Sequence, residues 1–132
     1  RDTEAVITDT VGFIRNLPKE LMSAFRATLD ELQEADLLLH VIDIASERFE
    51  EQIAAVENIL EELDIIHKPS IRVFNKADRF EDREALRALC RRFAAVAVSA
   101  LDKKTLFGLL EKIEGALPDA VCSGRENYVS EE

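Results

Sequence analysis

Short apolar segments alternate along this chain with segments of helical periodicity, and this alternation is the feature that most restricts its fold. The apolar segments end in polar residues and read as buried strands at residues 5–7, 37–42, 71–74 and 94–98. Apolar residues at helical spacing follow each of them, over residues 18–32, 46–63, 81–93 and 105–117. This order predicts an α/β fold, with a mostly parallel sheet of about four strands and helices on both faces.

Length and composition narrow the class of protein further. The chain has 132 residues, of which 47% are hydrophobic, enough for one globular domain. We expect that domain over residues 1–118 and a polar, frayed tail over residues 119–132. The net charge of -10 argues against binding to nucleic acid phosphates, because such binding needs clustered Lys and Arg.

The environment of the protein is indicated by what the sequence does not contain. No apolar run approaches the roughly 18 residues of a membrane span, so no membrane partner is expected. No signal peptide opens the chain. The two cysteines, Cys90 and Cys122, have neither metal-ligand spacing nor a disulfide pattern, which fits a reducing, cytoplasmic setting. The lone His40, inside the second strand, is interpreted as a packed core residue.

The strand at residues 71–74 stops abruptly at Asn75, Lys76, Ala77 and Asp78. In open α/β sheets, ligands bind at the carboxyl ends of strands. A carboxylate at Asp78 could accept both parallel donors of guanine, its ring N1–H and its amino group, whereas adenine offers a lone pair at the corresponding place. Lys76 could lay its apolar stem along the base, and Asn75 could tie the base to neighbouring loops. The alternative is an ordinary turn, since Asn and Asp are common turn residues.

A second motif, of the pattern Asp-x-x-Gly, follows the first strand at Asp9, Thr10, Val11 and Gly12. An aspartate there could hold Mg²⁺ through a water, because Mg²⁺ keeps its waters and takes few carboxylates. Gly12 would let the backbone approach a terminal phosphate and donate its N–H. A plain strand-to-loop turn would also account for this pattern.

Three stretches closely resemble the HflX family of bacterial GTPases: residues 9–18, 24–29 and 34–43. The Asn-Lys-x-Asp motif and Val98-Ser99-Ala100 match motifs found across many GTPases. The resemblance covers nearly all of residues 4–118. It implies a truncated, three-layer G domain of the Ras-like, P-loop NTPase type.

The resemblance also implies a function and roles for residues. It suggests a GTP-hydrolysing switch that uses Mg²⁺ and GTP or GDP and acts on the large ribosomal subunit. Asp9 and Gly12 would sense Mg²⁺ and the terminal phosphate, Asp9 through a water. Asn75, Lys76 and Asp78 would read guanine, while Ser99 and Ala100 would brace the base.

No catalytic residue is assigned. Phe13 stands where Ras-like enzymes place a water-orienting glutamine, so intrinsic hydrolysis is expected to be slow.

The sequence contains no Gly-x-x-x-x-Gly-Lys-Ser/Thr phosphate loop, and it begins at Arg1 within the approach to a strand. We therefore expect a piece of a longer protein that binds GTP weakly, does not hydrolyse it and has no cofactor bound. In the family's fold, the missing first strand lies between the strands at 5–7 and 37–43. Its loss predicts an unpaired edge, compensated by association of two chains, as a homo-oligomer or swapped dimer, or by repositioning of the first strand.

Two other functions are open at this point. The chain could be a protein-interaction module whose acidic helices dock a partner and whose GTPase motifs are relics. It could also be a receiver-like phospho-acceptor domain, since Asp9, Asp43 and Lys76 all follow strands. The receiver hypothesis leaves Asn75 and Asp78 without a role.

Overall fold

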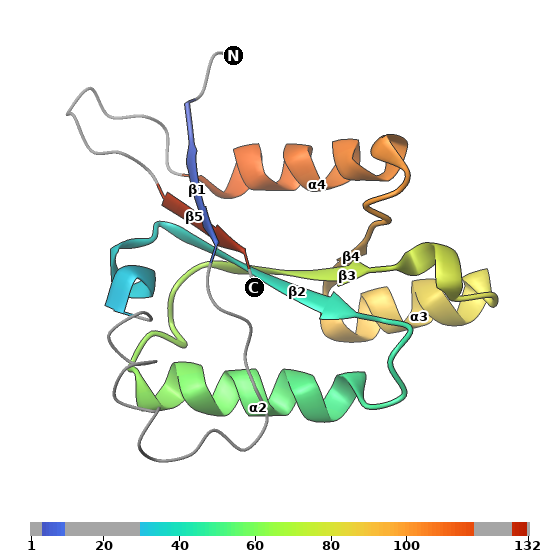
Figure 1. Ribbon diagram of the computed structural model, residues 1–132, viewed down its shortest axis with the longest axis horizontal. Helices are drawn as coiled ribbons and strands as arrows, with labels where there is room; N and C mark the ends of the chain where they lie inside the picture. Colours follow the sequence, from blue (N-terminus) through green and yellow to red (C-terminus); the bar gives the residue numbers. More distant parts are fainter. Residues whose placement is uncertain (1–3, 10–29, 118–127, 132) are drawn as a thin grey trace.

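A five-stranded sheet in which every described pair of strands is parallel forms the centre of the molecule (Figure 1). The computed structural model describes residues 4–9, 30–117 and 128–131. The spatial order of the strands is β1-β5-β2-β3-β4. Their bounds are β1 Val6–Asp9, β2 Leu37–Asp43, β3 Ser70–Asn75, β4 Ala95–Ala97 and β5 Tyr128–Glu131.

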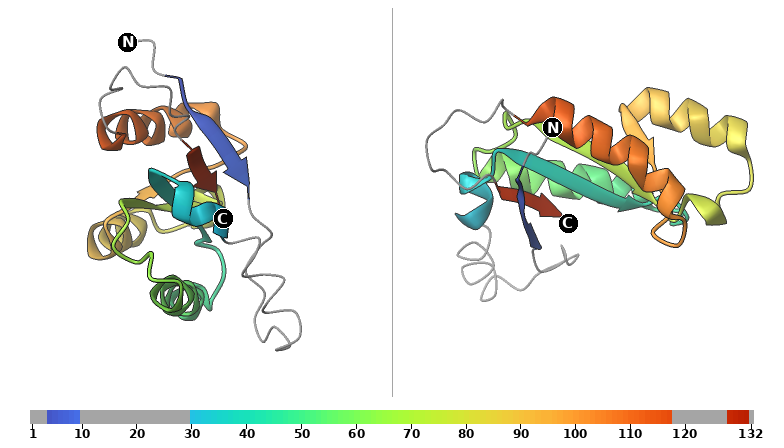
Figure 2. Two further views of the ribbon diagram at one scale, coloured as in Figure 1. Left: turned by 90° about the vertical axis from the view of Figure 1, so that its left-hand side faces the viewer. Right: turned by 90° about the horizontal axis from the view of Figure 1, so that it is seen from above.

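Helices cover both faces of this sheet. The helices α2 (Phe49–Glu62) and α3 (Arg83–Phe93) lie on one face, and α4 (Lys103–Ala116) lies on the other (Figures 1 and 2). A short 3₁₀ turn, η1 (Ala77–Arg79), follows β3. Residues 30–34 are helical as well, and the rest of the helix expected over residues 18–32 lies outside the described residues. None of the helices in the described part of the chain is long and apolar enough to cross a membrane.

The central strand β2 is buried on both faces, because its side chains alternate between two apolar layers. Leu37 and Leu39 pack with Leu117 on the α4 side. Leu38 belongs to a cluster with Val56 of α2 on the opposite side. The α2 and α3 side also holds Phe74, whose fully buried ring meets the rings of Phe49 and Phe93 edge to face; the centroid distances from Phe74 are 6.0 and 5.9 Å.

Some large apolar side chains of β1 and α4 are exposed. Ile7 of β1 is 67% exposed, and Phe107 and Leu110 of α4 are 66% and 53% exposed. In the described part of the chain, these three apolar side chains are therefore in contact with solvent.

The predicted fold class is confirmed, with one correction. The α/β class, the parallel sheet and the helices on both faces are present, but the sheet has five strands instead of about four. The fifth comes from the expected tail, where residues 128–131 form β5 and are not frayed. This strand occupies the gap predicted between β1 and β2, so β1 keeps a strand neighbour without a second chain.

Candidate functional site

Three strands end side by side and bring together most of the predicted site residues that the structure describes. Asp43 ends β2, Asn75 ends β3, and the two are register partners in adjacent strands. Ser99 and Ala100 follow β4, the next strand along. Parallel pairing therefore places residues from three distant parts of the sequence at one edge of the sheet.

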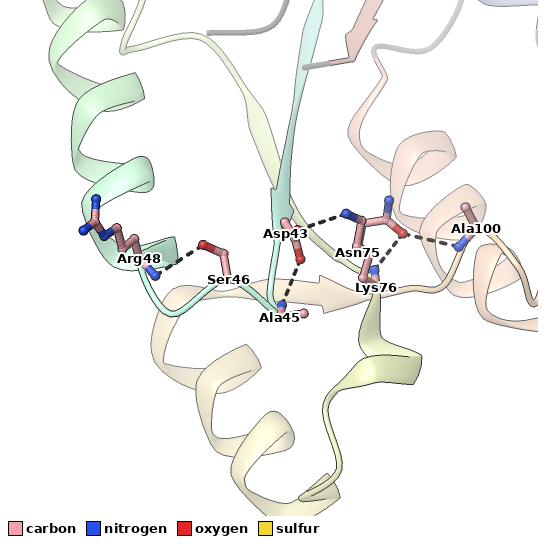
Figure 3. A network of polar contacts seen from close by, with 7 residues as sticks. All are labelled: Asp43, Ala45, Ser46, Arg48, Asn75, Lys76 and Ala100. Atoms are coloured by element: carbon pink, nitrogen blue, oxygen red, sulfur yellow. Dashed lines mark hydrogen bonds and ion pairs between the residues drawn. The ribbon is translucent and has the colours of Figure 1, made fainter. Parts of the chain in front are cut away.

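Asn75 joins the ends of β3 and β4. Its side-chain oxygen Oδ1 accepts the backbone N–H of Lys76 at 2.8 Å and that of Ala100 at 3.3 Å (Figure 3). The family resemblance implied that Ala100 would brace a base. In this structure it donates to Asn75, so Asn75 holds the two loops together.

Lys76 has a left-handed backbone, with φ of 60° and ψ of 33°. Its ammonium Nζ lies 3.0 Å from Oδ2 of Asp43 (Figure 3). The other carboxylate oxygen of Asp43 accepts the backbone N–H of Ala45 at 3.0 Å. Sequence reasoning assigned Asp43 a role only in the receiver hypothesis, and the register of β2 against β3 makes it the partner of Lys76.

Asp78 lies on η1 and is held from the neighbouring loop. The hydroxyl of Ser99, only 3% exposed, donates to Oδ1 of Asp78 at 2.9 Å. Ser99 is fixed in turn by Thr105, whose Oγ1 accepts the Ser99 N–H at 2.9 Å. Asp78 is itself an exposed residue. Ser99 thus orients an acidic residue that solvent can reach at the edge of the sheet.

This arrangement can present hydrogen-bonding groups to a flat polar ligand. A fixed carboxylate is a strong acceptor for paired N–H donors, and an adjacent lysine stem offers an apolar surface for a ring. The bonds from Asn75 and Ser99 hold the loops in place before any ligand arrives, which reduces the ordering that binding requires. Thr105 was missed from the sequence, because a helical threonine carries no signal of such a contact.

The residues predicted to face a phosphate and Mg²⁺ are only partly described. Asp9 is exposed at the end of β1, whereas Thr10, Val11, Gly12 and Phe13 lie outside the described residues. In the described ranges, His, Cys, Asp and Glu side chains form no group of three or more suited to a metal ion. A single exposed carboxylate does fit Mg²⁺, which keeps several waters and uses one or two carboxylates together with substrate phosphates.

The receiver hypothesis requires Asp9 to lie close to Asp43 and Lys76. Asp9 ends β1, and β5 separates that strand from β2. The register also places Asp9 level with Leu39, four residues before Asp43. A separation of about 10 Å across the sheet and about 13 Å along the strands is too far for these side chains to share one phosphoryl group. The order of the strands therefore disfavours a receiver.

A second polar cluster lies between the sheet and α2, away from the strand ends, with its histidine buried and its ion pair half-buried. His40 is 8% exposed, and its register partner Arg72 forms an ion pair with Glu57 of α2 and donates to the carbonyl of Phe93 at 2.9 Å. Burial and the nearby Arg72 charge lower the pKa of His40 from 6.5 to about 4, against a smaller opposite effect of Glu57. The cluster lines a small cavity of about 40 Å³ that does not include the Asn75, Lys76 and Asp78 group. His40 is thus the buried core residue that the sequence predicted.

Comparison with known proteins bears directly on the strand-end site. Residues 1–76 match the family model described as "50S ribosome-binding GTPase". GTPase HflX of Escherichia coli is 54% identical over 81 residues, which cover 61% of this chain and 19% of that protein. GTPase HflX of Caldanaerobacter subterraneus is 45% identical over 120 residues, 86% of this chain and 26% of that protein. GTPase HflX of Magnetococcus marinus is 39% identical over 116 residues, which cover 88% of this chain and 27% of that protein. The chain therefore spans about a quarter or less of the length of these relatives.

Proposed function

Because the chain belongs to the 50S ribosome-binding GTPase family, and within it to the HflX GTPases, we propose that its strand-end loops read guanine in a GTP-binding domain. The observation that carries this proposal is the joining of the two loops: Ser99 orients Asp78, and Asn75 accepts from Ala100. These are the residues that a guanine-reading site would need to hold at fixed positions.

Each residue has a chemical role in this proposal. Asp78 accepts the two parallel N–H donors of guanine, which makes the site selective against adenine. Lys76 covers one face of the base with its stem, while Asp43 keeps its ammonium at the rim. The loops that carry Lys76 and Asp78 are held in place for the base by two hydrogen bonds. Ser99 donates to Asp78, and Ala100 donates to Asn75.

The phosphate side of the site is assigned to Asp9, Thr10, Val11 and Gly12. Bound Mg²⁺ would neutralise phosphate charge, and Asp9 would hold it through a water at the end of β1. This sequence has no phosphate-loop motif, so we propose that the chain alone binds GTP weakly and does not hydrolyse it.

The name of the matching family extends the proposal to a partner. We propose that the longer GTPase to which this chain corresponds acts in the cytoplasm on the large ribosomal subunit. The net charge of -10 makes this segment a poor ligand for ribosomal RNA, so other parts of that protein would supply the main contacts. The chain alone should therefore not co-sediment with isolated large subunits at physiological salt.

Nucleotide recognition is tested by NMR titration of the ¹⁵N-labelled chain with GMP and, separately, AMP up to millimolar concentration. We expect GMP to shift the amide signals of Asn75, Lys76, Asp78 and Ala100, and AMP to leave them in place. Asp78→Asn should weaken GMP binding by about ten-fold or more, because a hydrogen bond to a charged group contributes roughly 1.5–3 kcal/mol.

Asp64→Asn provides the matched control. It makes the same carboxylate-to-amide change at an exposed residue beyond α2, whose positive φ of 58° asparagine tolerates well. GMP binding should be the same in this variant as in the wild type. Equal amide shifts with GMP and AMP, or no shifts with GMP, would contradict guanine recognition. Tight binding of GTP would contradict only the proposal that the chain alone binds GTP weakly.

A further inference from the structure

The small cavity beside His40 lies between α2 and the N-terminal halves of β2 and β3. Two register pairs line it, Leu38 with Ser70 and His40 with Arg72. Their side chains share one face of the sheet, the face on which Leu38 packs against α2. The cavity is therefore separate from the group around Asn75, which lies at the opposite ends of the same strands.

His40 forms the buried side of this cavity. Its imidazole is only 8% exposed, and within the described ranges neither of its ring nitrogens has a hydrogen-bond partner. Buried polar side chains rarely lack a partner, because a buried polar group that makes no hydrogen bond costs free energy. Solvent reaches the other side of the cavity, since Ile66 is 45% exposed and Ser70 is exposed as well. The cavity thus leads from the surface to an unpaired imidazole.

The polar groups around the cavity are mainly hydrogen-bond donors. Lys68 donates to two backbone carbonyls, which leaves a third ammonium N–H for a ligand. Arg72 pairs with Glu57 and binds one carbonyl, and its guanidinium has further N–H groups. The hydroxyl of Ser70 and the imidazole N–H add one donor each. Two cationic side chains stand against one carboxylate, so this lining is positive in a chain whose net charge is -10.

The size of the cavity restricts what it can bind. Its volume of about 40 Å³ has room for about three water molecules, at roughly 10–15 Å³ each. Leu60, Ile65 and Ile66 add apolar surface to the lining. A ligand that fits is therefore small and rich in acceptors, with one negative charge and a short apolar end.

We propose that this cavity binds a small carboxylate anion of the size of acetate, with its oxygens toward His40, Lys68 and Arg72. The carboxylate accepts charge-assisted hydrogen bonds from the two cations and a bond from the imidazole N–H, for which no described residue is an acceptor. The methyl group lies against the apolar part of the lining. The Glu57 carboxylate competes with the ligand for Arg72, so binding is moderate. This proposal is independent of nucleotide binding.

The first experiment follows the imidazole nitrogens of the ¹⁵N-labelled chain by NMR at neutral pH during a titration with sodium acetate. The chain has two histidines, and the exposed His67 does not line the cavity, so it reports general effects of salt. The His40 ring signals should shift with half-saturation below about 20 mM, while those of His67 stay in place. Acetamide has the shape of acetate without its charge, and pivalate carries the same carboxylate on a bulky tert-butyl group. Neither should shift the His40 signals.

The second experiment removes the competing carboxylate. Glu57→Gln frees the Arg72 guanidinium for the ligand, so acetate should bind this variant at least about five-fold more tightly than the wild type. Such a gain of affinity cannot arise from a loss of folding. Glu61→Gln makes the same change at an exposed residue of α2 that does not line the cavity, and it should leave the affinity for acetate unchanged.

Each result decides one part of the proposal. No shift of His40 at about 100 mM acetate, or an equal shift with acetamide, would overturn the anion site and leave water as the partner of the imidazole. An equal shift with pivalate would overturn the size of ligand that the cavity selects. Unchanged or weaker binding in Glu57→Gln, or an equal gain in Glu61→Gln, would overturn the role of Arg72. GMP recognition would stand in every case, because the GMP titration reads the opposite ends of the strands.

Discussion

Acidification should destabilise this protein through His40. In the folded chain the imidazole is almost completely buried beside the Arg72 guanidinium, which lowers its pKa from 6.5 to about 4. The unfolded chain therefore binds the proton first as the pH falls. The neutral imidazole contributes its full stability above pH 6.5, and this contribution is lost progressively as the pH falls toward 4.

The size of the effect follows from the difference in pKa. A pKa difference of about 2.5 between the unfolded and the folded chain lowers the free energy of unfolding by roughly 3.4 kcal/mol once His40 is protonated in both states. Between pH 7 and about pH 5.5, the titration of His40 alone should lower the free energy of unfolding by roughly 1.2 kcal/mol. That interval stays above the sequence pI of about 4.7, near which the protein would lose solubility.

The measurement compares urea unfolding, followed by circular dichroism, for the wild type and His40→Gln at several pH values in this interval. Glutamine does not titrate, so the difference in unfolding free energy between the two proteins isolates the His40 term from the many carboxylates. This difference should shrink by roughly 1.2 kcal/mol from pH 7 to about pH 5.5, whatever its starting value.

The exposed His67 supplies a matched control. His67→Gln removes an imidazole that lies at the surface, so its unfolding profile should run parallel to that of the wild type. A difference between wild type and His40→Gln that stays constant within about 0.3 kcal/mol would refute the reasoning, because it would show that burial beside Arg72 does not disfavour the imidazolium.

Three further predictions concern stability and are checked by urea unfolding. Asp82→Ala should cost about 1 kcal/mol, because the Asp82 carboxylate accepts the Ala85 N–H at 3.0 Å as the N-cap of α3; Glu81→Ala is the control. Phe74→Ala should cost roughly 3–5 kcal/mol, because it empties the fully buried centre of the three-ring cluster, whereas Phe107→Ala, at a ring 66% exposed, should cost far less. Asp43→Asn should change stability by less than about 1 kcal/mol, because the side chains of the Lys76 pair are 47% and 39% exposed and solvent screens their attraction; a larger loss would mean that the pair supports the fold.

The strand ends could be predicted from the sequence because their signals are local. An apolar run that stops at Asn75 places the following residues at the carboxyl edge of a parallel sheet, and the same reasoning places Ser99 and Ala100 there. The contact between Ser99 and Asp78 then follows from the two strands being neighbours. Residue types and periodicity were sufficient for this much.

The fifth strand and the Asp43 contact could not be predicted in the same way. Tyr128–Glu131 is too short and too polar to be distinguished from a tail, and its place depends on a gap between two distant strands. The partner of Lys76 depends on the register of β2 against β3, which sets which polar residue comes alongside. Both features depend on pairing between strands that are distant in the sequence, which a short stretch of sequence does not reveal.

The pairing of β1 with β5 joins segments separated by nearly the whole of this chain. Since β1 has no other strand neighbour among the described elements, its place in the sheet depends on β5 arriving. Closing so long a loop is among the slowest steps in forming a native topology. Once this chain is folded, β1 and β5 should therefore open together as one unit in hydrogen exchange, while β2 and β3 stay protected.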